Sequence, residues 1–285
     1  MGPHHDGDAR GRPIGADERT GVLHPSNLAR YAARWLDPDP AIRDVVDQYW
    51  HVRWALSAGE SIDQRIVTIP AVTLTVEEGD VPAPLVITGA QSAVWARRII
   101  GSGDVFAIRL RPAGLAVLGA VPAAGIVDAA VPVTRELDAR LHSLLRAVER
   151  ERGAELRAQA ADRAITGYLR QHPIDADGRL ANAVVDELTT RLRTRTGQDL
   201  ADRLGASERA IQRALQRTVG LGPKRTSRLV RLQEVARALA SADPPDLAAL
   251  AAELGYVDQA HLHHDFQDVA GISPGAYTRS LRALE

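Results

Sequence analysis

Between residues 24 and 133 the apolar positions fall into short, partly alternating runs, and sustained helical periodicity is confined to residues 112–120. β-Branched residues dominate the runs, and segments rich in glycine, proline or acidic residues separate them. This pattern predicts β-strands at 66–69, 72–76, 85–88 and 105–110. Several short strands with turns between them predict a small β-barrel or sandwich.

An uncharged run of 16 residues extends from Pro112 to Val127. Two prolines and three glycines interrupt it, and it is shorter than the about 20 apolar residues that a membrane helix needs. The run therefore predicts a buried helix followed by a loop, and we expect no membrane span.

The pattern becomes helical after residue 133. Leu137, Leu141, Leu144, Leu145 and Val148 have the spacing of an amphipathic helix, and Leu156 and the segment from Ile165 to Leu169 continue the pattern after Gly153. A proline and a glycine within 171–178 predict a linker. Beyond the linker we expect only helices, near 181–195, 198–204, 207–218, 223–240, 246–254, 258–270 and 274–284.

Two stretches of this helical half repeat each other at an offset of about 50 residues. Leu200, Leu204 and Gly205 correspond to Leu250, Leu254 and Gly255, and Pro223 corresponds to Pro274. Such repeats mark duplicated supersecondary units. Each copy has a short helix, a glycine turn and a capped second helix, which predicts two helix-turn-helix units in tandem and points to DNA binding.

These patterns predict an α+β protein with four parts. Residues 1–22 are rich in Gly, Asp, Arg and Pro and predict a disordered tail, not a secretory signal. The β-rich domain is expected at 23–133, a helical connector with its linker at 134–178, and the DNA-binding domain at 179–285. We expect a soluble, cytoplasmic protein.

The charge of the chain is distributed unevenly between the two helix-turn-helix units. The 285 residues carry a net charge of −1. Residues 179–237 hold 13 Lys and Arg against 6 Asp and Glu, a net of +7, whereas the chain from residue 241 onward holds 2 against 7. The basic segment predicts attraction to nucleic-acid phosphates at the first unit.

The second helix of the first unit carries the residues best suited to reading bases. Ser207 is a suitable N-cap, and Ile211 and Leu215 face inward. Arginine hydrogen-bonds both major-groove acceptors of guanine, and glutamine suits adenine. The candidates on the outer face are Arg209, Gln212 and Arg213, with Gln216 and Arg217 further along. The alternative interpretation is a solvated basic surface.

Phosphate contacts are predicted around the start of the next helix and at the cap of the reading helix. Contacts of this kind position a protein on DNA without reading its sequence. The candidates are Ser207, Lys224, Arg225, Thr226 and Arg228.

The second unit has a different outer face. Asp258 is its predicted cap, and the outward positions are Gln259, His261, His263 and His264, with no Lys or Arg. Phosphate attraction is then weak near neutral pH unless histidines are protonated. We therefore expect unequal halves, in which the first unit supplies most of the affinity. Metal binding by His261 and His264 is an alternative, but no matched second ligand pair is visible.

The stretch 250–277, with Gly255-Tyr256, Gln259-Ala260-His261, Gly271-Ile272-Ser273-Pro274 and Tyr277, closely resembles the second half of the AraC/XylS-type regulator signature. Ser207, Gln212-Arg213 and Arg231-Leu232-Gln233 resemble its first half. The resemblance implies a compact seven-helix domain whose two recognition helices enter successive major-groove segments. By position it implies base contacts from Arg209, Gln212 and Arg213 in the first helix, and from Gln259, His261, His263 and His264 in the second. Leu215 and His264 depart from the pattern, which usually has an aromatic and a basic residue there.

The front of the chain resembles the sensing domain of a subgroup of these regulators. The similarity lies in Tyr49-Trp50, Trp54, Gly89 and the segment 108–114, and it implies a diverged cupin-like β-domain. The candidate ligand contacts are Trp50, Trp54, Trp95 and Arg109. Two alternatives are open: the tryptophans are core or interface residues, or the domain only dimerises.

Competing enzymatic chemistry finds little support in the composition. The chain has no cysteine, which excludes thiolate-based methyl transfer. Residues 52–141 contain no histidine, which disfavours a metal-dependent oxygenase. We expect no cofactor and no enzymatic activity.

The sequence thus predicts a sequence-specific transcription regulator controlled by a small-molecule effector. Its expected partners are double-stranded DNA, RNA polymerase if it activates, and a second copy if it dimerises. A ligand-independent architectural DNA-binding protein is the leading alternative. A small-molecule-binding protein with a vestigial DNA domain is a third.

Overall fold

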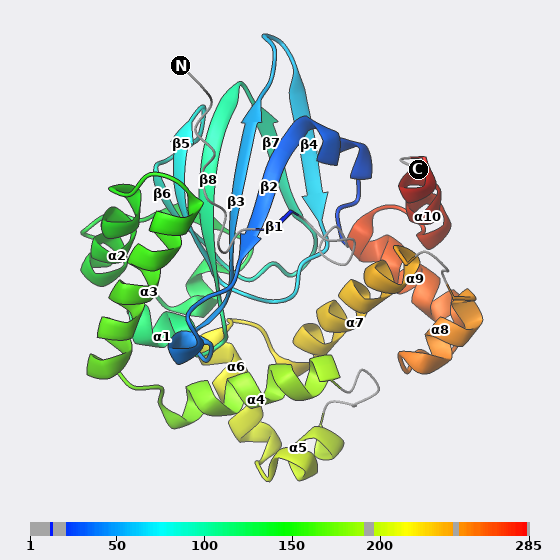
Figure 1. The fold of residues 1–285 in the computed structure, drawn as a ribbon. Coiled ribbons are helices and arrows are strands. Elements are labelled where there is room, and N and C mark those ends of the chain that lie inside the picture. The colour runs from blue at the N-terminus through cyan, green and yellow to red at the C-terminus, as the bar shows by residue number, and fades with distance from the viewer. Residues whose placement is uncertain (1–11, 14–20, 191–196, 242–244, 284–285) are drawn as a thin grey trace.

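The structure is a computed structural model that describes residues 12–13, 21–190, 197–241 and 245–283 (Figure 1). The first part is a β-rich domain whose antiparallel seven-stranded sheet has the order β1-β2-β3-β8-β5-β6-β9, beside a separate two-stranded sheet of β4 and β7. The strands are β1 (Arg12–Pro13), β2 (Tyr31–Leu36), β3 (Val46–Ala55), β4 (Ser61–Ile66), β5 (Thr73–Gly79), β6 (Leu85–Thr88), β7 (Trp95–Ile100), β8 (Ser102–Leu110) and β9 (Ala130–Pro132).

Alternation along the central strands gives the seven-stranded sheet two buried faces. Tyr49 of β3 and Phe106 of β8 pack with their ring centroids 5.6 Å apart in a core that includes α2 and α3. On the opposite face, Trp54 and Val105 pack against Ile62 and Ile99 of the two-stranded sheet. The predicted β-rich fold class is confirmed, although the two sheets do not close into a continuous barrel.

Most helices of the helical half match the sequence expectation. Two predicted inner-face residues of the connector do not: Leu137 lies before the first connector helix and is 41% exposed, and Leu156 is 48% exposed. Short 3-10 helices are η2 (Pro25–Arg30), η3 (Pro40–Ile42) and η4 (Ala123–Ile126). The α-helices are α1 (Gly114–Leu118), α2 (Ala139–Glu149), α3 (Ala154–Gln171), α4 (Ala176–Thr190), α5 (Gln198–Leu204), α6 (Glu208–Thr218), α7 (Pro223–Leu239), α8 (Leu247–Glu253), α9 (Gln259–Ala270) and α10 (Pro274–Arg282). The run 112–127 forms the predicted buried helix and loop as α1 and η4.

Helix α4 begins five residues before its predicted start. Gly178, expected in a linker, is a buried residue of its first turn. A Cβ added there would lie 3.1 Å from the Cβ of Ala113, so the glycine allows a close approach between α4 and the β-rich domain. The remainder of the predicted helix, residues 191–195, lies outside the described residues.

Most of the predicted N-terminal tail also lies outside the described residues. Within it, Arg12–Pro13 pairs with β2, and Gly21 and Val22 are placed. Leu23, just beyond it, is buried together with Val67 and Ala90 in the same core as the C-terminal helices. These three side chains of the β-rich domain therefore extend the core of the helical domain. Among the described residues, no helix has the length and apolar content that crossing a bilayer requires.

A buried ionic network fixes α3 to the sheet. Arg157, whose side chain is 2% exposed, donates to Asp104 at 2.7 Å and also to Glu78. Asp104 lies 2.8 Å from Nε2 of His51. Burial alone would raise the pKa of Asp104, but the hydrogen bond with His51 and the charges of His51 and Arg157 outweigh it and hold the pKa below its ordinary value.

Asp104→Asn is expected to lower the free energy of unfolding at pH 7 by roughly 1.5–3 kcal/mol, the range for hydrogen bonds to charged groups. Because the folded-state pKa is depressed, this contribution is present above the ordinary pKa of 3.8 and is lost as the pH falls through the folded value. Denaturant unfolding of both proteins from pH 7 to pH 3 measures it. The difference should shrink toward pH 3; a constant difference would contradict the assignment.

Candidate nucleic-acid interface

The first helix-turn-helix unit consists of α5, a turn at Gly205 and α6. Gly205 has φ 58°, the left-handed conformation that lets α5 end abruptly. The hydroxyl of Ser207 accepts a hydrogen bond from the Ala210 amide at 3.2 Å, which confirms the predicted N-cap. Ile211 and Leu215 are buried, as their spacing predicts, and this fixes which face of α6 is turned outward.

The outward face of α6 carries the predicted base-reading residues. Arg209, Gln212 and Arg213 are all exposed. The side chains of Arg209 and Gln212 make no ion pair or hydrogen bond with any other residue that the structure describes. Their polar groups are therefore available to a ligand without the loss of a contact within the protein.

Arg213 and Arg217 have acidic partners that sequence analysis assigned to the linker. Asp177, in the first turn of α4, accepts from Arg213 at 3.2 and 3.4 Å and from Arg217 at 3.0 Å. Asp175 accepts from the other terminal nitrogen of Arg217. The hydrogen bond from Arg213 is the largest influence on the pKa of Asp177 and lowers it. Burial acts in the opposite direction, but the hydrogen bond from Arg217 and the charges of both arginines add to the lowering, so the pKa lies below its ordinary value. No local sequence signal predicts these pairs, because about 40 residues separate the partners.

The second unit consists of α8, a turn at Gly255 and α9. Asp258 caps α9 by accepting from the His261 amide at 2.7 Å, as predicted. Gln259, His261 and His264 are exposed and His263 is half-buried. The His261 ring lies edge-on to Tyr256 with the centroids 5.2 Å apart. In the part of the chain that the structure describes, no group of three or more His, Asp or Glu side chains could share a metal ion.

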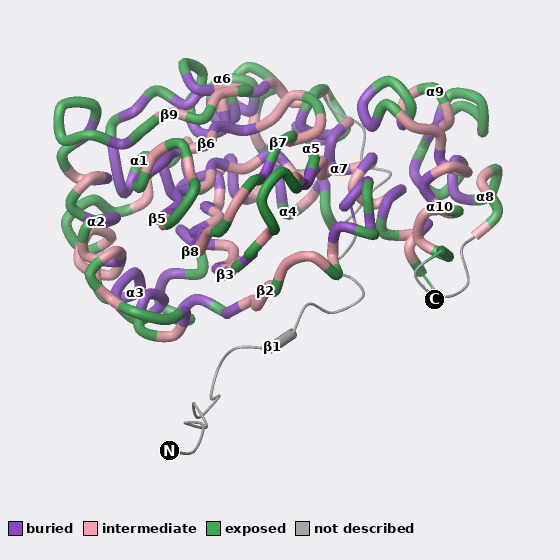
Figure 2. Tube along the Cα trace, turned by 90° about the horizontal axis from the view of Figure 1, so that it is seen from above, coloured by how far each residue is buried: buried purple, intermediate pink, exposed green. Residues whose placement is uncertain are grey.

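The predicted phosphate-contact residues lie in different environments. Ser207, Lys224 and Arg225 are exposed. Thr226, in contrast, is fully buried, so it packs inside the domain instead of facing a phosphate. Arg228 donates to Asp265 of α9 at 2.6 Å, which joins α7 to the second recognition helix. Figure 2 shows α6 and α9 along the same edge of the molecule, as simultaneous contact with one duplex requires.

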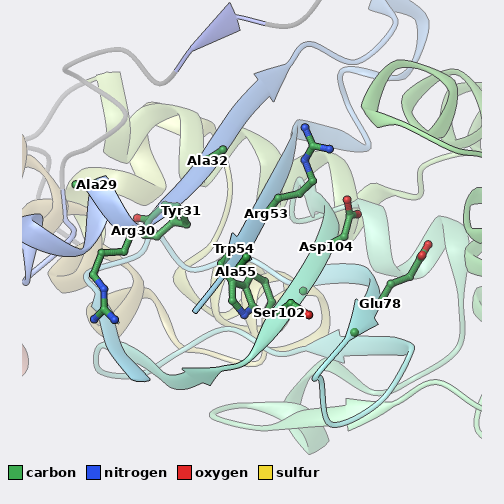
Figure 3. A pocket seen from close by; sticks show the side chains of 12 residues that line it. Ala29, Arg30, Tyr31, Ala32, Arg53, Trp54, Ala55, Glu78, Ser102 and Asp104 are labelled. Carbon is green, nitrogen blue, oxygen red and sulfur yellow. The ribbon is translucent and has the colours of Figure 1, made fainter. Parts of the chain in front are cut away.

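The predicted ligand contacts do not converge on one site. Trp50 stacks on Trp35 with ring centroids 5.2 Å apart, and the Arg109 guanidinium lies about 6 Å from both rings while bonded to Asp47. Trp95 is on β7 in the smaller sheet. Of the four predicted ligand contacts, only Trp54 lines the pocket at the ends of β2, β3, β5 and β8, which is open and has a volume of about 820 Å³ (Figure 3).

The pocket also has residues that sequence analysis missed. Tyr31, Arg53, Glu78 and Asp104 line it together with Trp54 (Figure 3). Tyr31 on β2 and Gly103 on β8 are the partners of Trp54 in the strand register, and this pairing brings the pocket residues of the three strands together. Strand pairing of this kind is not readable from a single sequence, so the aromatic content alone pointed to other residues.

Comparison with known proteins agrees with this geometry. Residues 200–280 match the family model described as a helix-turn-helix domain, and residues 34–132 match a domain of unknown function, DUF6597. No curated protein gives a significant match. Two capped units with exposed recognition helices form an AraC-type helix-turn-helix domain in the C-terminal part of the chain. The domain predicted from the sequence is confirmed.

Three solved structures show a distant similarity to this chain. A probable AraC family transcriptional regulator from Rhodopseudomonas palustris is 25% identical, covering 37% of this chain and 96% of that chain, with a TM-score of 0.31. ToxT from Vibrio cholerae is 8% identical, covering 82% of this chain and 98% of that chain, with a TM-score of 0.43. A ToxT structure with bound unsaturated fatty acid is 10% identical, covering 82% and 96%, with a TM-score of 0.39.

Ser207→Ala is expected to lower the free energy of unfolding by about 1 kcal/mol, because the amides at the start of α6 lose their acceptor. Ser207→Asp should retain the cap and hence the stability, yet weaken DNA binding by placing a negative charge at the exposed helix start. Denaturant unfolding and duplex binding measure the two effects. Equal destabilisation by both variants would show that the hydroxyl does not act as a cap.

Proposed function

We propose that this regulator recognises a specific DNA sequence mainly through α6, that α9 refines the choice, and that a small-molecule effector acts through the β-rich domain. The observation that carries the proposal is the outward face of α6, where Arg209, Gln212 and Arg213 are exposed. The helix is capped by Ser207, and its opposite face is buried. A helix of this kind fits the major groove, and these side chains suit its acceptors and donors.

The unequal roles of the two units follow from their charge. Lys224 and Arg225 stand exposed beside the first unit. Among the described residues of α9, the outward positions hold glutamine, histidine and aspartate but no lysine or arginine. Phosphate neutralisation supplies most of the non-specific affinity of DNA-binding proteins. The first unit therefore provides most of the affinity, and Gln259, His261, His263 and His264 provide weaker, pH-sensitive contacts.

Effector control is supported by separate attachments of the β-rich domain to the helices that pack against the two units. At α4, which contacts α6, Arg111 donates to both carboxylate oxygens of Asp186 at 2.7 Å. At α10, which contacts α9, the Gly21 amide donates to the Tyr277 hydroxyl at 3.1 Å. A ligand that binds two arrangements of the β-rich domain unequally would shift the spacing of α6 and α9 by linkage.

The pocket that contains Trp54 and the stack of Trp35, Trp50 and Arg109 are the candidate effector contacts of this proposal. RNA polymerase is the further partner if the protein activates transcription, and a second copy if it dimerises. The alternative is a ligand-independent DNA-binding protein whose β-rich domain only mediates dimerisation. Such a protein would show a steep salt dependence and little preference among sequences.

Arg213→Ala is expected to weaken binding to the preferred duplex by about 1–3 kcal/mol, because one guanine loses its bidentate partner. Its loss on unrelated duplexes should be much smaller. Lys224→Ala is the control, since the loss of a phosphate contact should weaken binding to all duplexes alike and reduce the salt slope by about one unit. Titrations with both duplexes at two salt concentrations measure this. If Arg213→Ala lost the same binding free energy on both duplexes, Arg213 would contact phosphate and not read a base.

A double variant, Tyr277→Phe with Asp186→Asn, removes the Gly21–Tyr277 hydrogen bond and the charge pair of Arg111 with Asp186, and leaves the aromatic core and the exposed faces of α6 and α9 intact. If the β-rich domain sets the spacing of the two units, binding should tolerate a wider range of spacer lengths between the two DNA blocks. Affinity for a single block should stay unchanged, which serves as the internal control. If the dependence of binding on spacer length stayed unaltered, the proposed coupling would be contradicted.

A further inference from the structure

The two arginines that face Asp177 use their guanidinium groups differently. Arg213 presents Nε and Nη2 to the carboxylate, at 3.4 and 3.2 Å. Its Nη1 has no partner among the described residues, and the side chain is 62% exposed in spite of the ion pair. The outer end of the group, formed by Nη1 and the second hydrogen of Nη2, is therefore open to a ligand.

Arg217 is bound the other way round. Its Nη1 donates to Asp177 at 3.0 Å and its Nη2 donates to Asp175. Both terminal nitrogens are engaged, so Arg217 cannot offer its end to a base without breaking these bonds. Its position one turn beyond Arg213 lets it balance the charge of Asp177 and hold that carboxylate in place.

Asp177 lies on a well-fixed part of the structure. Its side chain is 13% exposed. Further along α4, the buried Asn182 accepts from the Ala113 amide at 3.0 Å and donates to the carbonyl of Asp44 at 2.9 Å. The orientation of α4, and with it the position of the Asp177 carboxylate, is thus set by bonds that do not involve DNA.

We propose that Asp177 is a positioning residue that orients Arg213 for end-on hydrogen bonding to a guanine, and that Arg217 balances the charge of Asp177 without reading a base. The inference rests on the proposed function and deepens it. End-on bonding to guanine O6 and N7 uses two terminal hydrogens, which is the part of Arg213 that the carboxylate leaves open. A side chain held in its bound conformation loses less rotamer entropy on binding.

The pair is not a simple competitor for DNA phosphate. A carboxylate that covered the DNA-binding end of Arg213 would engage both terminal nitrogens, whereas Asp177 engages Nε and Nη2 and leaves Nη1 without a partner among the described residues. The four charged groups cancel to zero net charge, so Asp177 does not leave an unbalanced negative charge on the reading face.

The test uses the full-length chain and the duplex selected by the wild-type protein from a random pool. Single-base variants of that duplex replace each guanine, and the affinity ratio of parent to variant gives the discrimination. Asp177→Asn should lower the discrimination at the guanine read by Arg213 by about 3- to 10-fold, in keeping with the ordering of one long side chain. Affinity for unrelated duplexes should not fall, because a negative charge has been removed.

Asp175→Asn is the matched control, since it removes the same charge from a carboxylate that contacts only Arg217 among these two arginines. Its discrimination should equal that of the wild type. In an Arg213→Ala background, Asp177→Asn should have no further effect on discrimination, which a role in helix packing alone would not produce. Thermal unfolding of each variant checks that the domain remains folded.

The proposal is overturned if Asp177→Asn tightens binding to all duplexes by one factor and leaves the discrimination unchanged, since Asp177 would then only compete with phosphate. It is also overturned if Asp177→Asn lowers the discrimination equally with and without Arg213. Failure of the proposed function looks different: the wild-type protein itself would then prefer no base, and no duplex would be selected.

Discussion

The attachment of α4 to the β-rich domain is the interaction on which the rest of the structure depends. The Asn182 amide satisfies the Ala113 amide and the Asp44 carbonyl in a buried position, where unmade hydrogen bonds are costly. Gly178 permits the close approach that these bonds need. One turn earlier, the same helix presents Asp177 to α6. A single helix therefore connects the β-rich domain to the surface that faces DNA.

The second unit is attached by different means, and this explains why the two units need not act alike. The Gly21–Tyr277 bond and the burial of Leu23 among the C-terminal helices join it to the start of the β-rich domain. The Arg228–Asp265 pair joins α7 to α9, so a cation that could neutralise phosphate is bound within the protein. Together with the missing lysines and arginines on α9, this shifts the electrostatic contribution toward α6.

Local sequence signals predicted the helical half well because its structure is determined locally. Caps such as Ser207 and Asp258 and turn glycines such as Gly205 act over one helical turn. The β-rich half was predicted as a class, yet β1, β2, β3, β7 and β9 were not identified, and the strand predicted at 66–69 overlaps β4 only at Ile66. Pairing between distant strands determines these elements. For the same reason the predicted ligand contacts are dispersed, and the pairing of Asp177 with Arg213 was not foreseen. Thr226 shows that a polar residue at a helix start can still be buried.

The most direct measurement is selection of bound duplexes from a random DNA pool by the full-length protein at near-physiological salt. We expect strong enrichment of one sequence block that contains guanine and is read by α6. A second block, about one helical turn away and read by α9, should be enriched more weakly. Enrichment of two equally strong blocks would contradict the unequal division between the units. Binding without enrichment of any sequence, with or without the β-rich domain, would contradict the central claim that this protein reads DNA sequence.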